Sequence, residues 1–334
     1  MKEDYRTALA KSLQEIPGGS FEIQCQNDLS AASPLPVKQI TQTTGKGRIK
    51  SILVYPGIAI SFHQYLAEEI SFHHPPADHV LEIDHCRIGR VGWNMADGAA
   101  VYLGGGDLCL HSLASCAESR MTLPLGYYEG ISVTMDLHLL AKECPQIPKE
   151  AGFRAEAIYQ KLGGAAQPFG IPAGPKSDAL FSVLYDLPPS LRLPYCKLKA
   201  QEILLYLCQI DPKQEQGLSQ YVSRQTELIR DVRNFLVEHL DQRFTIEELS
   251  RKYLINTSTL KSVFKAVYGQ PIASYVKECR IQQAMKLLRE TQDSIAEIAR
   301  KVGYETQGKF TKAFKESVQV LPTEYRRWCQ KESI

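Results

Sequence analysis

A group of amide, hydroxyl and ammonium side chains near the C-terminus carries the chemistry needed to recognise nucleic-acid bases. A lysine ammonium can donate hydrogen bonds to O6 and N7 of guanine, and a glutamine amide can pair with N6 and N7 of adenine. The same lysines can contact phosphates, which position a protein on a duplex. The group consists of Gln307, Lys309, Thr311, Lys312 and Lys315. An upstream group of the same kind consists of Ser258, Lys261, Ser262 and Lys265.

Two short helices joined by a tight turn are predicted to present the downstream group. Ser294, followed three residues later by Glu297, forms a capping box, which marks a helix start. Gly303 suits the left-handed backbone that ends many helices, and Phe310 and Phe314 form the buried pair of the second helix. Apolar residues on one face of the first helix are Ile295, Ile298, Ala299 and Val302. This is the pattern of a helix-turn-helix unit.

The same pattern occurs again about 50 residues upstream, around the first polar group. Thr245 and Glu248 repeat the capping box, and Leu260 and Phe264 repeat the buried pair of the second helix. Because a repeated supersecondary unit supports its own assignment, both copies are predicted as helix-turn-helix units. Residues 272–290 between them are predicted as one long amphipathic helix. If the copies lie about 34 Å apart, both second helices can enter successive turns of the major groove.

The downstream copy carries a longer pattern, S-I-x-x-I-A-x-x-x-G-Y, then F-x-x-x-F-K and P-x-x-Y-R. With the upstream copy, it makes residues 226–330 resemble the AraC/XylS family of bacterial transcription regulators. The resemblance implies that exposed positions in the first two turns of each second helix read bases, here Ser258, Lys261, Ser262, Gln307, Thr311 and Lys312. One departure is Gln319, where the family usually has glycine. A residue other than glycine in a left-handed cap costs on the order of 1 kcal/mol.

The charge distribution agrees with a nucleic-acid partner for the C-terminal part. The formal net charge of the whole chain is only +2 at pH 7. Residues 225–334 hold about 19 basic and 14 acidic side chains, against about 20 and 23 in residues 1–224. The basic excess therefore lies in the part with the helix-turn-helix pattern, where phosphate contacts require it. The excess is modest, so charge alone does not establish DNA binding.

Cysteine usage indicates the compartment. The chain has nine cysteines, an odd number, and no C-x-x-C sequence. We expect reduced thiols and a cytoplasmic protein, with neither a signal peptide nor a membrane-spanning segment. A redox-sensing pair of cysteines remains an open alternative.

Residues 47–137 are predicted to form the β core of an N-terminal sensor domain. They contain many short apolar runs separated by glycine and aspartate turns, which favours a closed or double-sheet architecture. The Gly-Asp before a strand at residues 106–108 resembles the jelly-roll or cupin-like sensor domains that many AraC-type regulators carry. We therefore expect a two-domain α+β protein with a β-barrel or jelly-roll domain and an all-α domain containing two helix-turn-helix units.

The remaining boundaries follow from composition. Residues 138–210 are predicted to be helical, apart from a loop rich in glycine, alanine and proline at 163–176. The whole sensing and dimerisation domain is thus expected to span residues 1–210. Residues 211–225 are polar and contain proline and glycine, which is typical of a linker. The DNA-binding domain is expected at residues 226–334.

Histidines in the N-terminal part raise the question of a metal. They are His63, His73, His74, His79, His85 and His111. A cupin enzyme usually has an H-x-H pair, a following glutamate and a later histidine. His73 and His74 are adjacent and would point to opposite faces if they lay on a strand, and the Pro75-Pro76 that follows favours a loop. We therefore expect no metal, no cofactor and no catalytic residue. A cupin-type metalloenzyme fused to a DNA-binding domain is the alternative.

Aromatic and cationic residues in the β region are candidates for binding a small-molecule effector. An apolar pocket with a few polar groups is the usual form of such a site, and an aromatic or anionic molecule is the hypothesis. The candidates are Arg87, Arg90, Trp93, Tyr102, Tyr127 and Tyr128.

Residues 195–210 carry apolar side chains on more than one face of a predicted helix, among them Leu198, Ile203, Leu205 and Leu207. This helix is predicted either to pack on the sheet or to form a homodimer interface. The expected function is sequence-specific binding to promoter or operator DNA, controlled by an effector in the β domain. The family resemblance implies activation more often than repression, with RNA polymerase as a partner.

Overall fold

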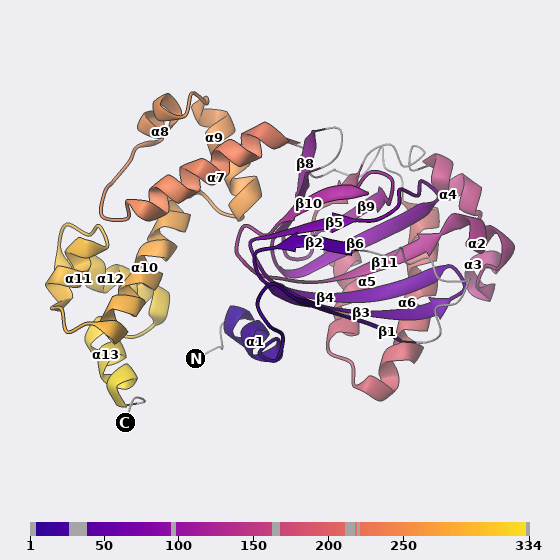
Figure 1. Ribbon diagram of the computed structural model, residues 1–334, viewed down its shortest axis with the longest axis horizontal. Helices are drawn as coiled ribbons and strands as arrows, with labels where there is room; N and C mark the ends of the chain where they lie inside the picture. Colours follow the sequence, from indigo (N-terminus) through magenta and orange to yellow (C-terminus); the bar gives the residue numbers. More distant parts are fainter. Residues whose placement is uncertain are drawn as a thin grey trace. The chain divides into compact units, whose positions relative to one another are not determined.

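The computed structural model describes residues 5–26, 39–94, 98–161, 168–210, 218 and 221–331. The chain divides into two compact units, Met1–Ser223 and Arg224–Ile334. We call them the β unit and the helical unit, because the described strands lie in the first and the second is built from helices (Figure 1). The protein is therefore a two-domain α+β chain, as predicted.

The β unit contains a seven-stranded sheet. Only β1 and β3 are parallel, and the other neighbouring strands are antiparallel. In spatial order the strands are β1 (Phe21–Gln26), β3 (Lys46–Tyr55), β4 (Ile58–Leu66), β11 (Tyr128–Asp136), β6 (Val80–Gly89), β9 (Leu108–Ser112) and β12 (Phe169–Ile171).

A six-stranded antiparallel sheet faces the seven-stranded sheet (Figure 1). Its strands in spatial order are β13 (Tyr221–Val222), β8 (Ala99–Leu103), β7 (Val91–Asn94), β10 (Glu118–Thr122), β5 (Glu69–His73) and β2 (Gln39–Thr43). Side chains from both sheets form one buried cluster, in which Tyr65 and Tyr128 of the larger sheet meet Trp93 and Met121 of the smaller one. The double-sheet architecture expected from the turn spacing is thus present.

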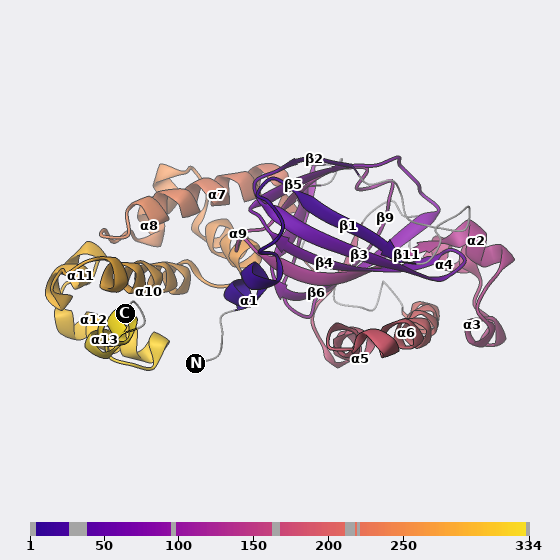
Figure 2. The same ribbon diagram turned by 60° about the horizontal axis from the view of Figure 1, so that its bottom comes forward.

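The seven-stranded sheet is buried on both faces. Successive side chains in a strand point to opposite faces, so Leu81 and Ile83 pack against helices, whereas Glu82 and Asp84 face the space between the sheets. The helices on the outer face are α2 (Leu137–Lys142), α3 (Gln146–Glu150), α4 (Ala155–Lys161), α5 (Pro175–Tyr185) and α6 (Pro189–Gln209). Figure 2 shows α5 and α6 lying along this face.

A separate small cluster attaches the N-terminal helix, α1 (Tyr5–Ser12), to the β unit. Leu9, Leu13 and Ile16 are buried together and contact Leu66 and Tyr127.

The helical unit consists of α7 (Ser223–Glu238), α8 (Ile246–Lys252), α9 (Thr257–Tyr268), α10 (Ile272–Glu290), α11 (Ile295–Lys301), α12 (Gln307–Val318) and α13 (Pro322–Lys331). The long helix predicted over residues 272–290 is confirmed as α10. Its apolar side chains Ile281, Ala284 and Leu288 share one core with Phe310 and Phe314 of α12. The helix pairs α8–α9 and α11–α12 therefore pack against one continuous helix, α10.

Two sequence-based boundaries of the β unit need correction. The sheets extend outside residues 47–137, because β1, β2, β12 and β13 pair with strands that are distant in sequence. Residues 163–176 were expected to be a loop, but Phe169–Ile171 forms β12 beside β9, and Pro175 begins α5. Local composition did not reveal these segments, because their pairing partners are remote.

The expected linker at 211–225 and the helix at 195–210 also differ from the structure. Tyr221–Val222 pairs with β8, and α7 begins at Ser223; residues 211–217, 219 and 220 lie outside the described residues. Helix α6 begins at Pro189 rather than Tyr195, since proline is tolerated in the first turn of a helix. Within the described residues, no helix is both long and apolar enough to cross a membrane.

Candidate functional site

The first helix of each pair begins with the predicted capping box. The Thr245 hydroxyl accepts a hydrogen bond from Glu248 N at 3.2 Å, and the Glu248 carboxylate accepts one from Thr245 N at 2.7 Å. Ser294 and Glu297 make the same two bonds at 3.2 and 2.7 Å. Each box satisfies backbone donors that a helix start leaves unpaired. Helices α8 and α11 therefore start where the sequence predicted.

The second helix of each pair is held by its own cap and by a buried apolar row. Asn256 accepts from Thr259 N at 2.7 Å at the start of α9, and Thr306 accepts from Lys309 N at 3.3 Å at the start of α12. The buried rows are Leu260, Val263, Phe264, Val267 and Tyr268 in α9, and Phe310, Ala313 and Phe314 in α12. Because these rows face the core, the opposite sides of both helices face outward.

The predicted DNA-contacting side chains lie on those outward sides. Ser258, Lys261, Ser262 and Lys265 of α9 are exposed, as are Gln307, Lys309, Lys312 and Lys315 of α12. Thr311 is half-buried. The Ser258 hydroxyl donates to the Asn256 side chain at 2.7 Å, and the Lys309 ammonium pairs with Glu305 at 2.6 Å. The five lysines therefore lie on the surface, and one of them, Lys309, is already paired.

Arg280 of α10 joins the segment between α7 and α8 to the turn between α11 and α12. Its guanidinium donates to Gln242 O at 2.6 Å and lies over the Tyr304 ring, 5.9 Å from the centroid. Gly303 has φ of +81°, and a Cβ there would lie 2.2 Å from Leu240 O. The turn between α11 and α12 thus approaches the end of α7 too closely for any residue with a side chain. These contacts hold the turn of the second pair against α10 and against the segment that follows α7.

In the β unit, a cavity of about 40 Å³ lies between the two sheets. Trp93 and Tyr128 contribute to its aromatic wall. Its polar lining consists of His63, His74, Glu82, Asp84, His111 and Cys116. These polar side chains are all buried, so the cavity combines a small volume with many groups that can carry charge.

Trp93 and Tyr128 are the predicted effector-binding residues that line this cavity, and Arg87 lies elsewhere. Arg87 pairs with Asp186 at 2.8 Å and with Glu129 at 3.4 Å. Its guanidinium also lies over the Tyr185 ring, 4.7 Å from the centroid. Arg87 therefore ties the end of α5 to the seven-stranded sheet.

The other predicted effector-binding residues are also outside the cavity lining. The Arg90 guanidinium lies against the turn at Gly104, where a Cβ would meet Nη1 at 2.4 Å. The Tyr102 hydroxyl accepts from Thr122 at 3.4 Å, and Tyr127 packs against the cluster of α1. The structure thus does not bring the six candidates together around one space.

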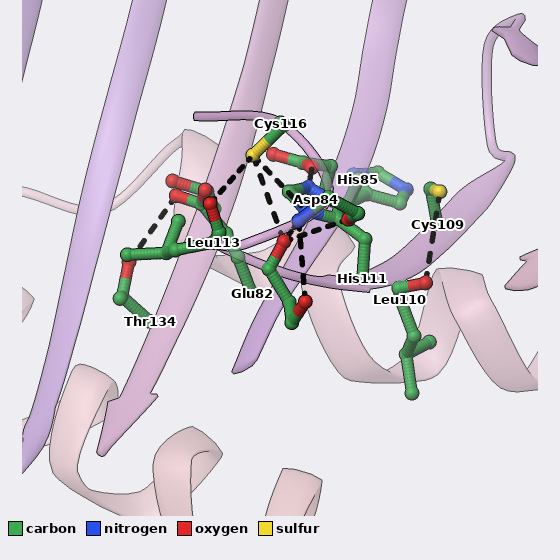
Figure 3. Close-up of polar contacts among 12 residues, drawn as sticks. Glu82, Asp84, His85, Cys109, Leu110, His111, Leu113, Cys116 and Thr134 are labelled. Carbon is green, nitrogen blue, oxygen red and sulfur yellow. Dashed lines mark hydrogen bonds and ion pairs between the residues drawn. The ribbon is translucent and has the colours of Figure 1, made fainter. Parts of the chain in front are cut away.

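Asp84, His111 and Cys116 form a buried chain of polar contacts in the cavity (Figure 3). His111 Nε2 lies 2.7 Å from the Asp84 carboxylate, and Nδ1 lies 3.1 Å from Ser112 O and 3.5 Å from Cys116 Sγ. A carboxylate and a carbonyl both accept, so each ring nitrogen acts as a donor. Both ring nitrogens of His111 therefore face acceptors, an arrangement that favours the protonated ring beside Asp84.

The protonation of this chain reflects mutual stabilisation of opposite charges. Burial opposes the imidazolium, but the Cys116 charge and the hydrogen bond to Asp84 raise the pKa of His111 well above its ordinary value. Burial likewise opposes the thiolate, whereas the charge of His111 and its hydrogen bond lower the pKa of Cys116 to about 7. Cys116 Sγ also lies 3.7 Å from His74 Nε2. None of the nine cysteines forms a disulfide in the structure.

The sequence-based prediction missed the charged groups of the cavity. Glu82 and Asp84 alternate with Leu81 and Ile83 in a strand, a pattern that places two carboxylates on one buried face. That alternation was the signal available in the sequence. His73 is exposed at the end of β5, whereas His74 follows the strand and is buried.

Comparisons with known proteins locate the similarity in the C-terminal part. Residues 249–327 match the family described as "Helix-turn-helix domain". The chain is 34% identical over 110 residues to the Transposon Tn10 TetD protein of Escherichia coli, covering 32% of this chain and 80% of that protein. It is 30% identical over 105 residues to the Arabinose operon regulatory protein of Escherichia coli K12, covering 31% of this chain and 36% of that one.

A solved structure of the C-terminal domain of AraT from Geobacillus stearothermophilus is 32% identical, with a TM-score of 0.30. It covers 31% of this chain and 88% of that one. The chain spans less than half the length of the longer regulators it matches, including 44% of RhaR of Mannheimia succiniciproducens.

Proposed function

The chain belongs to the AraC/XylS family of DNA-binding transcription regulators, and we propose that both helix pairs read DNA under the control of an effector held in the β unit. The observation that carries the proposal is the repetition of one arrangement. Each pair has a capped first helix and a second helix with a buried row and an outward polar, basic face. A single such pair has many structural explanations. Two pairs packed on the same long helix, α10, indicate a protein that reads DNA with two recognition helices.

In this proposal, α9 and α12 are the two recognition helices. Lysines such as Lys261 and Lys312 supply donors for guanine edges, and Gln307 offers an amide for adenine. Lys265 and Lys315, one turn further on, contact phosphates and fix the register. Gly308 contributes no side chain, so α12 reads fewer bases than a fully substituted helix.

The β unit is the proposed sensor. Its facing sheets support the assignment to a jelly-roll or cupin-like domain, and its cavity supports a bound ligand of small size. Ligand binding changes DNA occupancy only if the ligand binds the DNA-competent state more tightly than the other state. Family membership favours activation, with RNA polymerase as the partner at the promoter. We infer that the chain is a regulator without catalytic residues.

A cupin-type metalloenzyme fused to a DNA-binding unit is the second candidate, and one observation favours it. Glu82, Asp84 and His111 lie close together in the cavity. However, substrate pockets usually measure about 300–1,000 Å³, whereas this cavity has about 40 Å³. A ligand-sensing role therefore suits this space better than turnover of an organic substrate.

The proposal is tested by replacing one lysine on a recognition helix. DNA sequences bound by the full-length chain are first selected from a random library, and the protected bases are mapped by footprinting. Lys312→Ala is expected to weaken binding to the selected sequence by about 1–3 kcal/mol, because a bidentate contact to a base edge contributes that much discrimination. Fluorescence anisotropy at fixed salt measures the change.

Lys142→Ala is the matched control, since Lys142 is an exposed lysine in the last turn of α2 in the β unit. Its affinity for the selected DNA should equal that of the wild type. Equal affinities for Lys312→Ala and Lys142→Ala would count against α12 as a reading helix. A footprint confined to one turn of the major groove would count against reading by both α9 and α12.

A further inference from the structure

The seven-stranded sheet places three metal-binding side chains around one point. Glu82 and Asp84 are two residues apart on β6, so they share a face, and Glu82 lies opposite His111 on the neighbouring strand β9. Each offers a ligand atom, and these atoms all lie within 4.8 Å of one another. Atoms bound to a common ion at about 2.0–2.2 Å lie at most about 4.4 Å apart. Shifts of a few tenths of an ångström would therefore let all three bind one ion.

The charge of the cavity favours a cation. Glu82 is 4% exposed and Asp84 6%, and burying a carboxylate is unfavourable unless a counter-charge is near. Among the described residues that line the cavity there is no lysine or arginine. A divalent ion held between Glu82 and Asp84 would balance both carboxylates.

The hydrogen bonds around the cluster orient the ligand atoms. His111 Nδ1 is committed to Ser112 O at 3.1 Å, which leaves Nε2 as the atom that faces Asp84 and the cavity. Thr134 donates to Oε1 of Glu82 at 3.2 Å and so restrains that carboxylate (Figure 3). Metal-binding histidines and carboxylates are typically held in this way by a hydrogen bond at the other heteroatom.

The size of the cavity also selects the ligand. A water molecule needs about 10–15 Å³ by the same measure, so about 40 Å³ holds an ion with one or two waters. The aromatic or anionic effector expected from the sequence does not suit a space of this size with two carboxylates on its wall. One imidazole nitrogen with carboxylate oxygens suits zinc, iron(II) or manganese(II) among common ions.

We infer that Glu82, Asp84 and His111 bind one divalent transition-metal ion between the sheets, and that this ion is the signal sensed by the β unit. The second part rests on the proposed regulatory function, whereas the first part stands on the cavity alone. Cys116 Sγ lies 3.5 Å from Nδ1 of His111, on the side of the ring away from the proposed ion.

A second cluster on the surface provides the matched control. His79, Asp136 and His138 also have ligand atoms within 4.8 Å of one another. Yet the two histidine rings stack at 4.2 Å, and Asp136 accepts from the backbone of His138 and Leu139 as the cap of α2. His79 and Asp136 are only half-buried. This cluster is therefore explained by the local structure.

The test uses the full-length chain, stripped with EDTA and dialysed against ZnCl2 or, separately, MnCl2. Mass spectrometry of the metal content should find one ion per chain for the wild type and for His138→Ala. Asp84→Asn and Glu82→Gln should each weaken binding at least tenfold. Circular dichroism verifies that the variants are folded. Anomalous diffraction from wild-type crystals soaked with ZnCl2 locates the ion without reliance on any variant.

A dialysed chain that retains neither zinc nor manganese would overturn the metal site. Zinc density at His79 instead of His111 would also overturn it. An unchanged affinity in both Asp84→Asn and Glu82→Gln would also overturn it. For the signal, the affinity of the full-length chain for its selected DNA is measured with and without ZnCl2 or MnCl2. A change of at least fivefold that disappears in Asp84→Asn is expected.

The two proposals fail separately. If the ion binds at Asp84 but DNA affinity stays constant, the ion is not the signal, while the metal site and DNA reading both stand. If the ion binds and no DNA sequence is enriched under any condition, the proposed function fails and the metal site stands. If DNA is bound specifically but no ion is retained, this inference alone is wrong.

Discussion

One backbone position shows how a departure from the family pattern is accommodated at the residue scale. Helix α9 ends at Gly269 with φ of +80°, and α12 ends at Gln319 with φ of +66°. Both residues have a left-handed backbone conformation, which glycine adopts without strain and other residues do not. The Gln319 amide donates to Glu316 O at 2.9 Å, which offsets part of the strain. The cap geometry is thus the same in both helices although the residue differs.

Replacing Gln319 with glycine should stabilise the helical unit. Relief of the left-handed strain is expected to add about 0.5–1 kcal/mol to the free energy of unfolding, less the loss of one exposed hydrogen bond. Thermal unfolding followed by far-ultraviolet circular dichroism measures the change. Gly269→Ala at the equivalent position of α9 should act in the opposite direction by about 1 kcal/mol. If Gln319→Gly lowers stability, the cap does not store the strain assigned to it.

At the scale of elements, His85 attaches α5 to strand β6. Its ring stacks on Phe181 with centroids 4.7 Å apart, and Nδ1 lies 2.7 Å from the Tyr185 hydroxyl. Nε2 has no hydrogen-bond partner among the described residues. Burial lowers the pKa of His85 to about 4, with Asp178 raising it and Arg87 lowering it further. The neutral ring is therefore the form that the docked helix requires.

This depressed pKa makes the docking of α5 sensitive to acid. Above pH 6.5 the histidine is neutral in both the folded and the unfolded chain, so its contribution to stability is fully present. As the pH falls from 6.5 towards 4, only the unfolded chain binds the proton, and stability is lost. The expected loss through His85 at pH 4 is about 3 kcal/mol relative to pH 7.5.

Urea titrations of the Trp328→Phe chain at the two pH values, followed by Trp93 fluorescence, measure the effect. His85→Phe in the same background keeps the stacking on Phe181 and removes the titration. Between pH 7.5 and pH 4, the free energy of unfolding of this variant should fall by about 3 kcal/mol less than that of the Trp328→Phe chain. Equal losses in the two chains would show that another group governs the acid response.

At the scale of the whole molecule, α6 exposes apolar side chains on its outer face. Its inner face, including Ile203 and Leu207, is buried against the seven-stranded sheet. Its outer face keeps Leu191 45% and Leu198 60% exposed, seven residues apart. That spacing suits the seam between two packed helices, and a two-fold dimer would set α6 against itself. We propose a homodimer through this face.

Leu198→Glu is expected to weaken this dimer at least tenfold, because a charge would be buried at the centre of the seam. Sedimentation equilibrium of the full-length chain measures the dissociation constant. Ile147→Glu on α3 is the control, since Ile147 is 51% exposed on a different helix. A wild-type chain that stays monomeric at micromolar concentration, or a dimer unaffected by Leu198→Glu, would rule out the proposed seam.

Much of the helical unit could be predicted from local patterns. The capping boxes at Thr245 and Ser294, the turn at Gly303 and the extent of α10 depend on residues within a few positions of one another. Such local signals have the same effect whatever the rest of the fold, provided that the helix forms. The β unit was predicted less well, because β1, β12 and β13 each pair with a strand far away in sequence. Of the predicted effector-binding residues, only Trp93 and Tyr128 line the cavity.

By itself, therefore, the sequence determined the repeated helix pairs, their outward lysines and the presence of a β-rich unit. Only the tertiary structure decided which polar residues share the space between the sheets. Glu82 and Asp84 show their common face in the strand alternation, but His111 joins them through the register of β6 with β9, and Cys116 and His74 come from further segments. Register is set by long-range pairing and packing rather than by local preference.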